Sequence, residues 1–335
     1  MSASLQITAH WFPPHERNTA TSVGQLFNAL GVGLSFILGF TVVKEASEES
    51  GTVCDESITF KDLEPRDTRD DIMNLNYIHA GLDIILFLLI LIHYPSKPKN
   101  PPSISSAEER LDFIGGFKIL AKSRDAWLIL IAYAFPSCLL QLWQSMMVVS
   151  FTELDFKFSN VTSDVNDNCS YELCEHWVEV FGIVMCFVSI FTSIGVASFL
   201  SIFKRRMKLS IMILLGLSGI FMIFGTLILE QVITFSNLSG LKLALYLVLL
   251  PGTTLALCSS PITFELSVEN AFPVNEGVIG GWLTGWFNAL GAVFFLIFLI
   301  PGIGTRWLNY VLPFSVIAPI PFIAMVTDIV GSGLY

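Results

Sequence analysis

The chain has 335 residues, of which 53% are hydrophobic and 14% are charged, and its formal net charge is −10. Because soluble domains carry roughly 25% charged residues, this composition indicates a membrane protein. The acidic balance argues against nucleic-acid binding, and six cysteines are too few for a disulfide scaffold.

Eight apolar segments are long enough to cross a bilayer, since a spanning helix needs about 20 mostly apolar residues. They are residues 21–43, 72–94, 126–151, 178–203, 209–235, 241–266, 278–302 and 307–328. Lipid offers the backbone no hydrogen-bonding partner, so each segment is predicted to be an α-helix. The expected fold is an all-α polytopic membrane protein with eight transmembrane helices.

The first span opens with a segment that occurs twice. Residues 12–31 begin with FPPHE and end with FNALG, and residues 272–291 begin with FPVNE and end with FNALG. Each copy starts as a polar turn and passes into an apolar run, which indicates an internally duplicated membrane protein with its substrate site between the halves. Glycines in and beside these copies are expected at close helix contacts: Gly31, Gly33, Gly39, Gly277, Gly280, Gly281, Gly285 and Gly291.

A linker at 95–125 separates two spans from six. Prolines stiffen its first part, and Ala107 to Lys122 mixes apolar and charged positions in a pattern typical of a helix on a membrane surface. We expect residues 1–94 to end an N-terminal lobe and 95–125 to form a cytosolic linker with a surface helix. Residues 126–335 are expected to form a six-span C-terminal lobe.

Basic residues concentrate in two connections, which the positive-inside rule places in the cytosol. One is the turn KRRMK at 204–208, and the other is the linker, with Lys97, Lys99, Arg110, Lys118, Lys122 and Arg124. The 44–71 connection is acidic and the 152–177 connection is poor in basic residues, so both should face the lumen or the outside. Both termini are then cytosolic, in a protein of the plasma membrane or the lysosomal membrane.

The 152–177 connection carries two acceptor sequences for N-glycosylation, at Asn160 and Asn168. It also holds Cys169 and Cys174, which could pair as a disulfide on the non-cytosolic side. Sequons also arise by chance, so the agreement with the charge pattern is what favours glycans here.

Polar residues in the middle of apolar runs are candidates for a transport site, since burying them in a bundle is costly. Asn28 and Asn288 occupy equivalent positions in the duplicated segment, each next to small residues. An amide offers both donors and acceptors to a solute. The alternative is that each amide bonds a neighbouring helix and holds the bundle together.

The 126–151 span offers a second polar group, made of Gln141, Trp143 and Gln144. Gln141 and Gln144 share a helix face, as do Gln141 and Ser145. Pro136 is expected to break the helix just before them. A Gln-lined helix beside an indole suits a small polar or cationic aromatic solute, whereas the alternative for Trp143 is packing against lipid.

Three acids are candidates for a proton-carrying or gating role. Glu265 and Glu269 lie one turn apart near the cytosolic end of the 241–266 span, where pairing with basic loops is the simpler interpretation. Asp83 follows His79 by four residues, and such a pair either relays a proton or neutralises itself. The five histidines form no metal-ligand spacing, so no metal or cofactor is expected, and a membrane enzyme has little support.

Several motifs resemble solute carrier family 49 of the major facilitator superfamily, which includes the feline leukaemia virus subgroup C receptors and the disrupted in renal carcinoma protein 2 branch. They are WFPPHER at 11–17 with TAT at 19–21, YPSKP at 94–98 with PPS at 101–103, and PITFE at 261–265 with Val268, Glu269, Pro273, Glu276 and Gly277. Arg110 and Leu111 resemble the renal carcinoma branch in particular. The similar segments extend over nearly the whole chain.

The resemblance implies a major facilitator fold from span five to span twelve, without the first four spans. It also implies secondary active or facilitative transport of a small organic solute across the lipid bilayer by alternating access. Choline-carrying members place Gln, an aromatic residue and Gln where this chain has Ala29, Gln141 and Asn288. A pyridoxine-like vitamin is therefore expected first, with choline-like or haem-related cargo next. The alternative is a truncated, non-transporting membrane protein that acts as a partner or scaffold.

Overall fold

The computed structural model describes residues 65–93, 113–147, 150–151, 180–189, 206–235, 237–300, 302–304 and 306–327, with scattered residues in 7–38 and 191–195. Its helices are α3 (Pro65–His93), α5 (Phe113–Lys122), α6 (Arg124–Ser145), α9 (Met207–Leu229), α10 (Leu238–Asn270), α11 (Glu276–Ile297), α12 (Trp307–Ile317) and α13 (Ile320–Ala324). Within these described ranges there is no strand, so the predicted all-α architecture is confirmed.

Six of the predicted spans are present as helices long and apolar enough to cross a membrane, and α12 with α13 forms one of them. Of the other two, 178–203 is represented by a short apolar helix at Val180–Ser189, and 21–43 only by scattered helical residues. The predicted 209–235 span ends earlier than expected, at Leu229, because the chain turns at Glu230 and Gln231.

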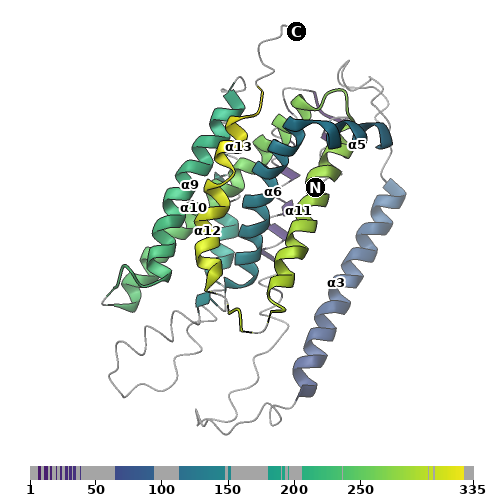
Figure 1. Ribbon diagram of the computed structural model, residues 1–335. Coiled ribbons are helices and arrows are strands. Elements are labelled where there is room, and N and C mark those ends of the chain that lie inside the picture. Colours follow the sequence, from purple (N-terminus) through teal and green to yellow (C-terminus); the bar gives the residue numbers. More distant parts are fainter. Residues whose placement is uncertain are drawn as a thin grey trace.

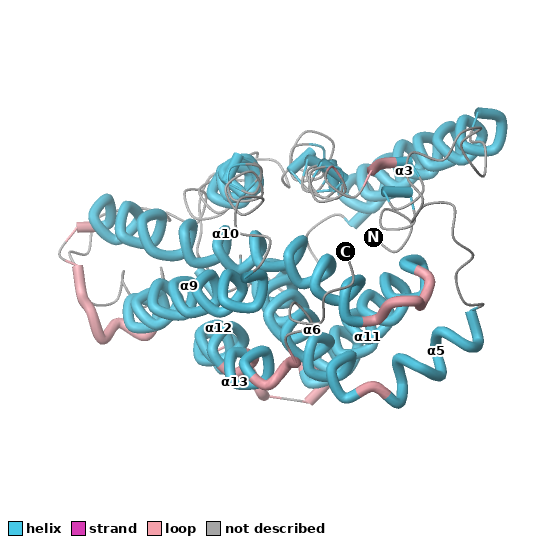
Figure 2. Tube along the Cα trace, turned by 90° about the horizontal axis from the view of Figure 1, so that it is seen from above, coloured by secondary structure: helices cyan, strands magenta, loops and turns pink. Residues whose placement is uncertain are grey.

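Helix α6 lies at the centre of the bundle. It packs against α10, α11 and α12, while α9 packs against α10 and α12 (Figure 2). Helix α3 stands apart from this group (Figure 1), and none of its apolar stretch is buried. The described residues of 113–327 therefore form one packed bundle, with α3 beside it.

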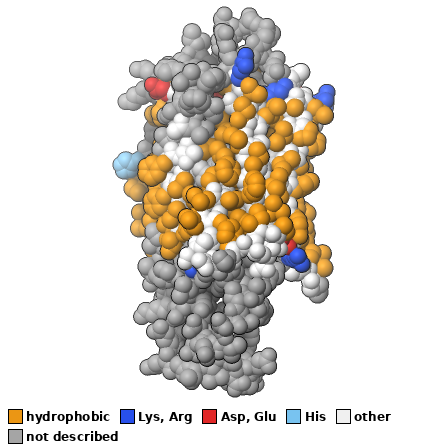
Figure 3. All heavy atoms as spheres, turned by 90° about the vertical axis from the view of Figure 1, so that its left-hand side faces the viewer, with side chains coloured by type: hydrophobic (Ala, Val, Ile, Leu, Met, Phe, Trp, Pro, Cys, Tyr) orange, Lys and Arg blue, Asp and Glu red, His pale blue; other side chains and the backbone are white. Residues whose placement is uncertain are grey.

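The bundle presents an apolar surface of membrane-spanning height. Figure 3 shows hydrophobic side chains in a continuous band on one face, with lysines and arginines above and below it. This distribution suits a protein whose middle is in hydrocarbon and whose ends reach the headgroups.

Helices approach most closely at glycines other than those expected from the sequence. A Cβ on Gly225 would lie 2.6 Å from Leu249 Cδ2, and one on Gly219 would lie 2.7 Å from Ile317 Cγ1. Gly31, Gly281 and Gly285, by contrast, have open space around them, so the expectation of a close helix contact at these three positions is wrong. All three are exposed, which is the physical reason.

Hydroxyl groups link the packed helices. Ser218 Oγ of α9 donates to the Gly252 carbonyl of α10 at 2.6 Å, and Thr226 Oγ1 donates to the Asn309 carbonyl of α12 at 2.7 Å. Such bonds replace the hydrophobic driving force that helices lack when lipid is the solvent.

The expected break at Pro136 does not occur, because α6 runs through it to Ser145. Proline removes one backbone hydrogen bond of the helix, to the carbonyl four residues before it, here that of Ala132. Ala132 and Pro136 are both buried, and packing against neighbouring helices compensates for the lost bond.

Two polar contacts define one end of the bundle. Lys208 Nζ at the start of α9 donates to the Val326 carbonyl at 2.6 Å, and the Thr327 hydroxyl donates to the Asp125 carboxylate at the start of α6. Helix α5 joins α6 at the same end, so we call it the α5 end. The opposite end carries the end of α9 and the start of α12 (Figure 1).

Candidate functional site

Helix α6 turns a row of polar residues away from the core. Gln141 and Ser145 are exposed and Ser137 is half-buried, and the three follow one another at intervals of four residues. Ser145 Oγ donates to the Gln141 carbonyl at 3.0 Å, which leaves the Gln141 side-chain amide at the surface. This spacing puts all three on one face of the helix. The sequence identified Gln141 and Ser145, and the same periodicity would have found Ser137.

Trp143 and Gln144 point elsewhere. The Trp143 ring is fully buried and packs edge-on against Phe151, with centroids 6.0 Å apart. It therefore lies in the core of the bundle, and its alternative placement against lipid is wrong. Gln144 Nε2 reaches Met185 Sδ at 3.7 Å on the neighbouring helix. The offset of two residues from Gln141 turns Trp143 toward the core, whereas Gln144 borders the row that Gln141 and Ser145 form and is half-buried through its contact with Met185.

Asn288 lies on the exposed side of α11. Its Nδ2 donates to the Thr284 carbonyl of the same helix at 2.7 Å, and Thr284 Oγ1 donates to the Gly280 carbonyl at 2.7 Å. The Asn288 bond is therefore within one helix, and among the described contacts the amide does not join two helices.

The row on α6 continues onto α10. Ser137 Oγ and Ser260 Oγ lie 3.5 Å apart, and either hydroxyl can donate. Because α6 packs against both α10 and α11, the exposed and half-buried hydroxyl and amide groups of these three helices belong to one bundle. We call Ser137, Gln141, Ser145, Ser260, Thr284 and Asn288 the polar face. None of these six side chains is charged, and each can form hydrogen bonds.

The other predicted residues lie on other segments or near the end of α10. Asn28 is an exposed helical residue, and Asp83 is exposed on α3. Glu265 and Glu269 lie in the last turns of α10 at the α5 end, the first half-buried and the second exposed. The predicted glycosylation and disulfide residues, Asn160, Asn168, Cys169 and Cys174, lie outside the described residues. In the part of the chain that is described, no cluster of acids, histidines or cysteines could hold a metal ion.

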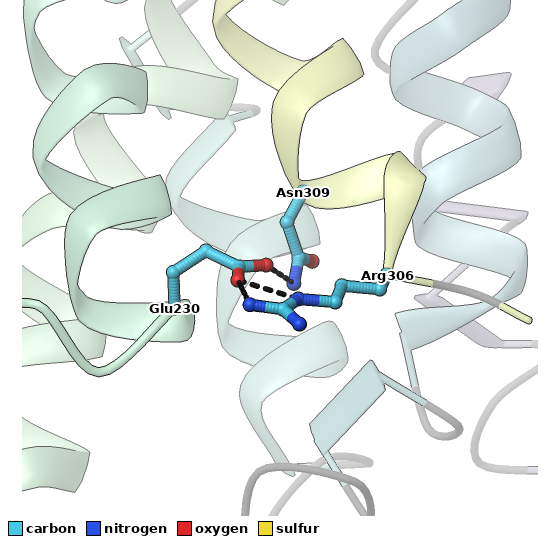
Figure 4. Close-up of polar contacts among 3 residues, drawn as sticks. All are labelled: Glu230, Arg306 and Asn309. Atoms are coloured by element: carbon cyan, nitrogen blue, oxygen red, sulfur yellow. Dashed lines mark hydrogen bonds and ion pairs between the residues drawn. The ribbon is translucent and has the colours of Figure 1, made fainter.

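The sequence reasoning missed a charged cluster at the end opposite α5, formed by Glu230, Arg306 and Asn309 (Figure 4). Glu230 follows α9, and its side chain is 5% exposed. Glu230 Oε2 accepts from Arg306 Nε at 2.7 Å, and Oε1 accepts from Asn309 Nδ2 at 3.1 Å. We call these three residues the Glu230 cluster. The sequence did offer a signal for this cluster, because Glu230 and Arg306 each stand at the end of an apolar segment.

The Glu230 cluster keeps its carboxylate ionised. Burial by itself would raise the pKa of Glu230, but hydrogen bonds from Arg306, Asn309 and Tyr310 and the charge of Arg306 outweigh it, and the pKa is lowered. The pKa of the exposed Arg306 guanidinium is raised by the same carboxylate. The cluster thus joins the end of α9 to the start of α12 at a membrane boundary.

A bundle of helices that are long and apolar enough to cross a membrane is the architecture of a multi-pass membrane protein. The family model for the Major Facilitator Superfamily matches residues 1–296, and the chain belongs to this superfamily. A crystal structure of a transporter of this superfamily, FucP, in the outward conformation has a TM-score of 0.58 at 11% identity. The match covers 97% of this chain and 72% of FucP.

Curated relatives agree with the resemblance to solute carrier family 49. The chain is 27% identical to a solute carrier family 49 member 4 homolog of Xenopus tropicalis, over 97% of this chain and 66% of the relative. It is 23% identical to the choline/ethanolamine transporter FLVCR2 of Rattus norvegicus, over 88% of this chain and 47% of that protein. The chain therefore spans just under two thirds of the length of the first of these relatives.

Proposed function

We propose that the chain takes part in transport of a small organic solute by alternating access, and that the solute contacts the polar face. The observation that carries this is the set of exposed, uncharged donors and acceptors on α6 and α11, chiefly Gln141 and Asn288. Polar groups at mid-membrane are costly and are kept where a pathway needs them. Asn28, the counterpart of Asn288 in the duplicated segment, is proposed to serve the same solute from the other half.

The domain division follows from the same proposal. Residues 1–94 would end the N-terminal lobe, 95–125 would link the lobes, and 126–335 would form the C-terminal lobe. Both basic connections meet at one end, since Lys118 and Lys122 on α5 lie at the same end as Arg206 and Lys208. This supports a cytosolic α5 end and cytosolic termini.

A pyridoxine-like vitamin is the first proposed substrate, with choline-like or haem-related cargo next. A hydroxylated aromatic ring with a nitrogen offers donors and acceptors that match the amides and hydroxyls of the polar face. The relative named as a choline/ethanolamine transporter supports a cationic alternative, but the polar face offers no carboxylate. Trp143 is proposed to stabilise α6 by packing in the core of the bundle, without contacting the solute.

The three acids are proposed to act in coupling or gating. Asp83 lies in the middle of the α3 span, where a carboxylate against lipid is costly, so we place it against protein. Glu265 and Glu269 at the α5 end are proposed to pair with the basic connections, which would close that end of the pathway.

The test is uptake of labelled pyridoxine into proteoliposomes that contain the purified chain. Asn288→Ala is expected to lower uptake at subsaturating solute by about tenfold, the effect of one lost hydrogen bond to a solute. Asn270→Ala is the matched control, because Asn270 Nδ2 also bonds its own helix, to the Leu266 carbonyl at 2.9 Å, but lies at the end of α10. Equal uptake in wild type and Asn288→Ala would remove Asn288 from the site.

A second candidate function is that of a non-transporting partner or scaffold. It is favoured by α3, none of whose apolar stretch is buried in the described chain and which therefore has surface for another membrane protein. A folded, monodisperse chain that moves none of the proposed solutes but co-purifies with one membrane protein would establish it.

A further inference from the structure

Helix α5 is held firmly against the bundle by one narrow face. Gly116 and Leu120 are buried, and a Cβ on Gly116 would lie 2.8 Å from Val274 Cγ1 at the turn before α11. Phe117 packs edge-on against Trp282 with centroids 5.2 Å apart. Because a larger residue has no room at Gly116, the position of α5 relative to α11 is well defined.

The junction between α5 and α6 is also fixed. Trp127 Nε1 donates to the Ala121 carbonyl at 3.0 Å, and Ser123 Oγ caps α6 by accepting from the Ala126 N–H at 3.3 Å. Figure 1 shows α5 lying across the end of the bundle, at a steep angle to α6 and α11. Since α6 begins its membrane crossing at Arg124, α5 lies at headgroup depth.

The exposed part of α5 is apolar on one side and basic on the next, and Phe117 borders the face that contacts the bundle. Phe113, Ile114 and Phe117 are exposed by 67%, 62% and 45%. Lys118 and Lys122 follow one turn apart on the side away from Gly116 and Leu120, and Arg124 comes two residues later. A helix that exposes apolar side chains on one side and cations on the adjacent side has the arrangement of an interfacial anchor.

No described residue of the bundle pairs with these three cations. In the described ranges, Lys118, Lys122 and Arg124 make no hydrogen bond or ion pair. The nearest acid in sequence, Asp125, accepts a bond from the Thr327 hydroxyl. Among the described residues, these three cations near the end of the bundle therefore carry positive charge that no acid pairs.

We propose that Lys118, Lys122 and Arg124 bind the headgroup of an anionic phospholipid in the leaflet at the α5 end, while Phe113, Ile114 and Phe117 lie against its acyl chains. Charge complementarity identifies the headgroup class, and the apolar side chains beside the cations require an occupant with hydrocarbon attached. The site is independent of the proposed transport function, because it uses no residue of the polar face.

The experiment measures lipid preference of the purified full chain in neutral detergent. Dioleoyl phosphatidylserine and dioleoyl phosphatidylcholine are titrated separately, and the rise in the thermal unfolding midpoint gives an apparent affinity for each. Wild type is expected to prefer the anionic lipid. Each cation near a membrane surface is worth about a fivefold change in affinity, so Lys118→Gln with Lys122→Gln should lower the preference by at least about tenfold.

Three controls test whether the positive charge at this position causes the lipid preference. Lys118→Arg with Lys122→Arg keeps the charge and should keep the preference, which also guards against misfolding of the Gln variant. Lys242→Gln removes one charge near the start of α10, at the opposite end, and should change the preference far less than Lys122→Gln. Inorganic phosphate should neither raise the midpoint nor displace the lipid.

The proposal is overturned by any of four results. These are equal affinity of wild type for the two lipids, an unchanged preference in the double Gln variant, an equal loss in Lys242→Gln, or full competition by inorganic phosphate. The last result would assign the cations to a free anion in place of a lipid.

Discussion

The Glu230 cluster allows a quantitative prediction about stability. Glu230→Ala removes the carboxylate that accepts from Asn309 Nδ2 and from Arg306 Nε. Asn309 is buried, so after the substitution its side-chain N–H loses its charged acceptor and water cannot readily replace it. A hydrogen bond to a charged group contributes about 1.5–3 kcal/mol. The Arg306 side chain is 65% exposed, and water replaces its lost partner, so its loss adds little.

We therefore expect Glu230→Ala to lower the free energy of unfolding by about 2 kcal/mol, chiefly through Asn309. For a chain of this size the thermal unfolding midpoint should fall by about 3 °C. Intrinsic fluorescence of the purified chain in detergent measures it. Asp70→Ala, which removes an exposed carboxylate on α3, is the matched control and should leave the midpoint unchanged. A Glu230→Ala midpoint within about 1 °C of wild type would refute the reasoning.

The same cluster predicts a pH dependence with a definite sign. Because the pKa of Glu230 is lowered in the folded protein, the ionised form stabilises the native state. That contribution is complete above the ordinary value of 4.5 and is lost as the pH falls through the lower value of the folded state. The midpoint difference between wild type and Glu230→Gln should therefore be constant near neutral pH and shrink in strong acid. A difference that grew on acidification would contradict this assignment.

Two further predictions concern packing and separate it from transport. Gly225→Val should lower the unfolding free energy by about 1–3 kcal/mol, because the new Cβ would meet the fully buried Leu249, whereas Gly281→Ala should be neutral since its surroundings are open. Thermal midpoints of the two variants decide this, and equal midpoints would show that the close contact is absent. Trp143→Ala should cost about 3–5 kcal/mol of stability, while Gln141→Ala should lower uptake without moving the midpoint. The reverse pattern would place Trp143 in the site and Gln141 in the framework.

Helical periodicity explains why part of the polar face was predictable. Gln141 and Ser145 are separated by one helical turn, so the sequence alone places them together. Ser260 joins them only through the contact with Ser137, which lies 123 residues away in the chain. No local pattern indicates which serine of α10 meets α6, because that depends on how the two helices cross.

The sequence by itself determined the class of the molecule, its spans and its basic connections. These follow from the cost of placing charges and unpaired backbone groups in lipid, which acts on each segment separately. Tertiary structure decided the rest. It buries Trp143, leaves open space around Gly281 and brings Gly225 into close contact with Leu249. It also pairs Glu230 with Arg306, which lies 76 residues away in the chain. The rotation of each helix about its axis is set by its neighbours, and lipid, being as apolar as the side chains, does not set it.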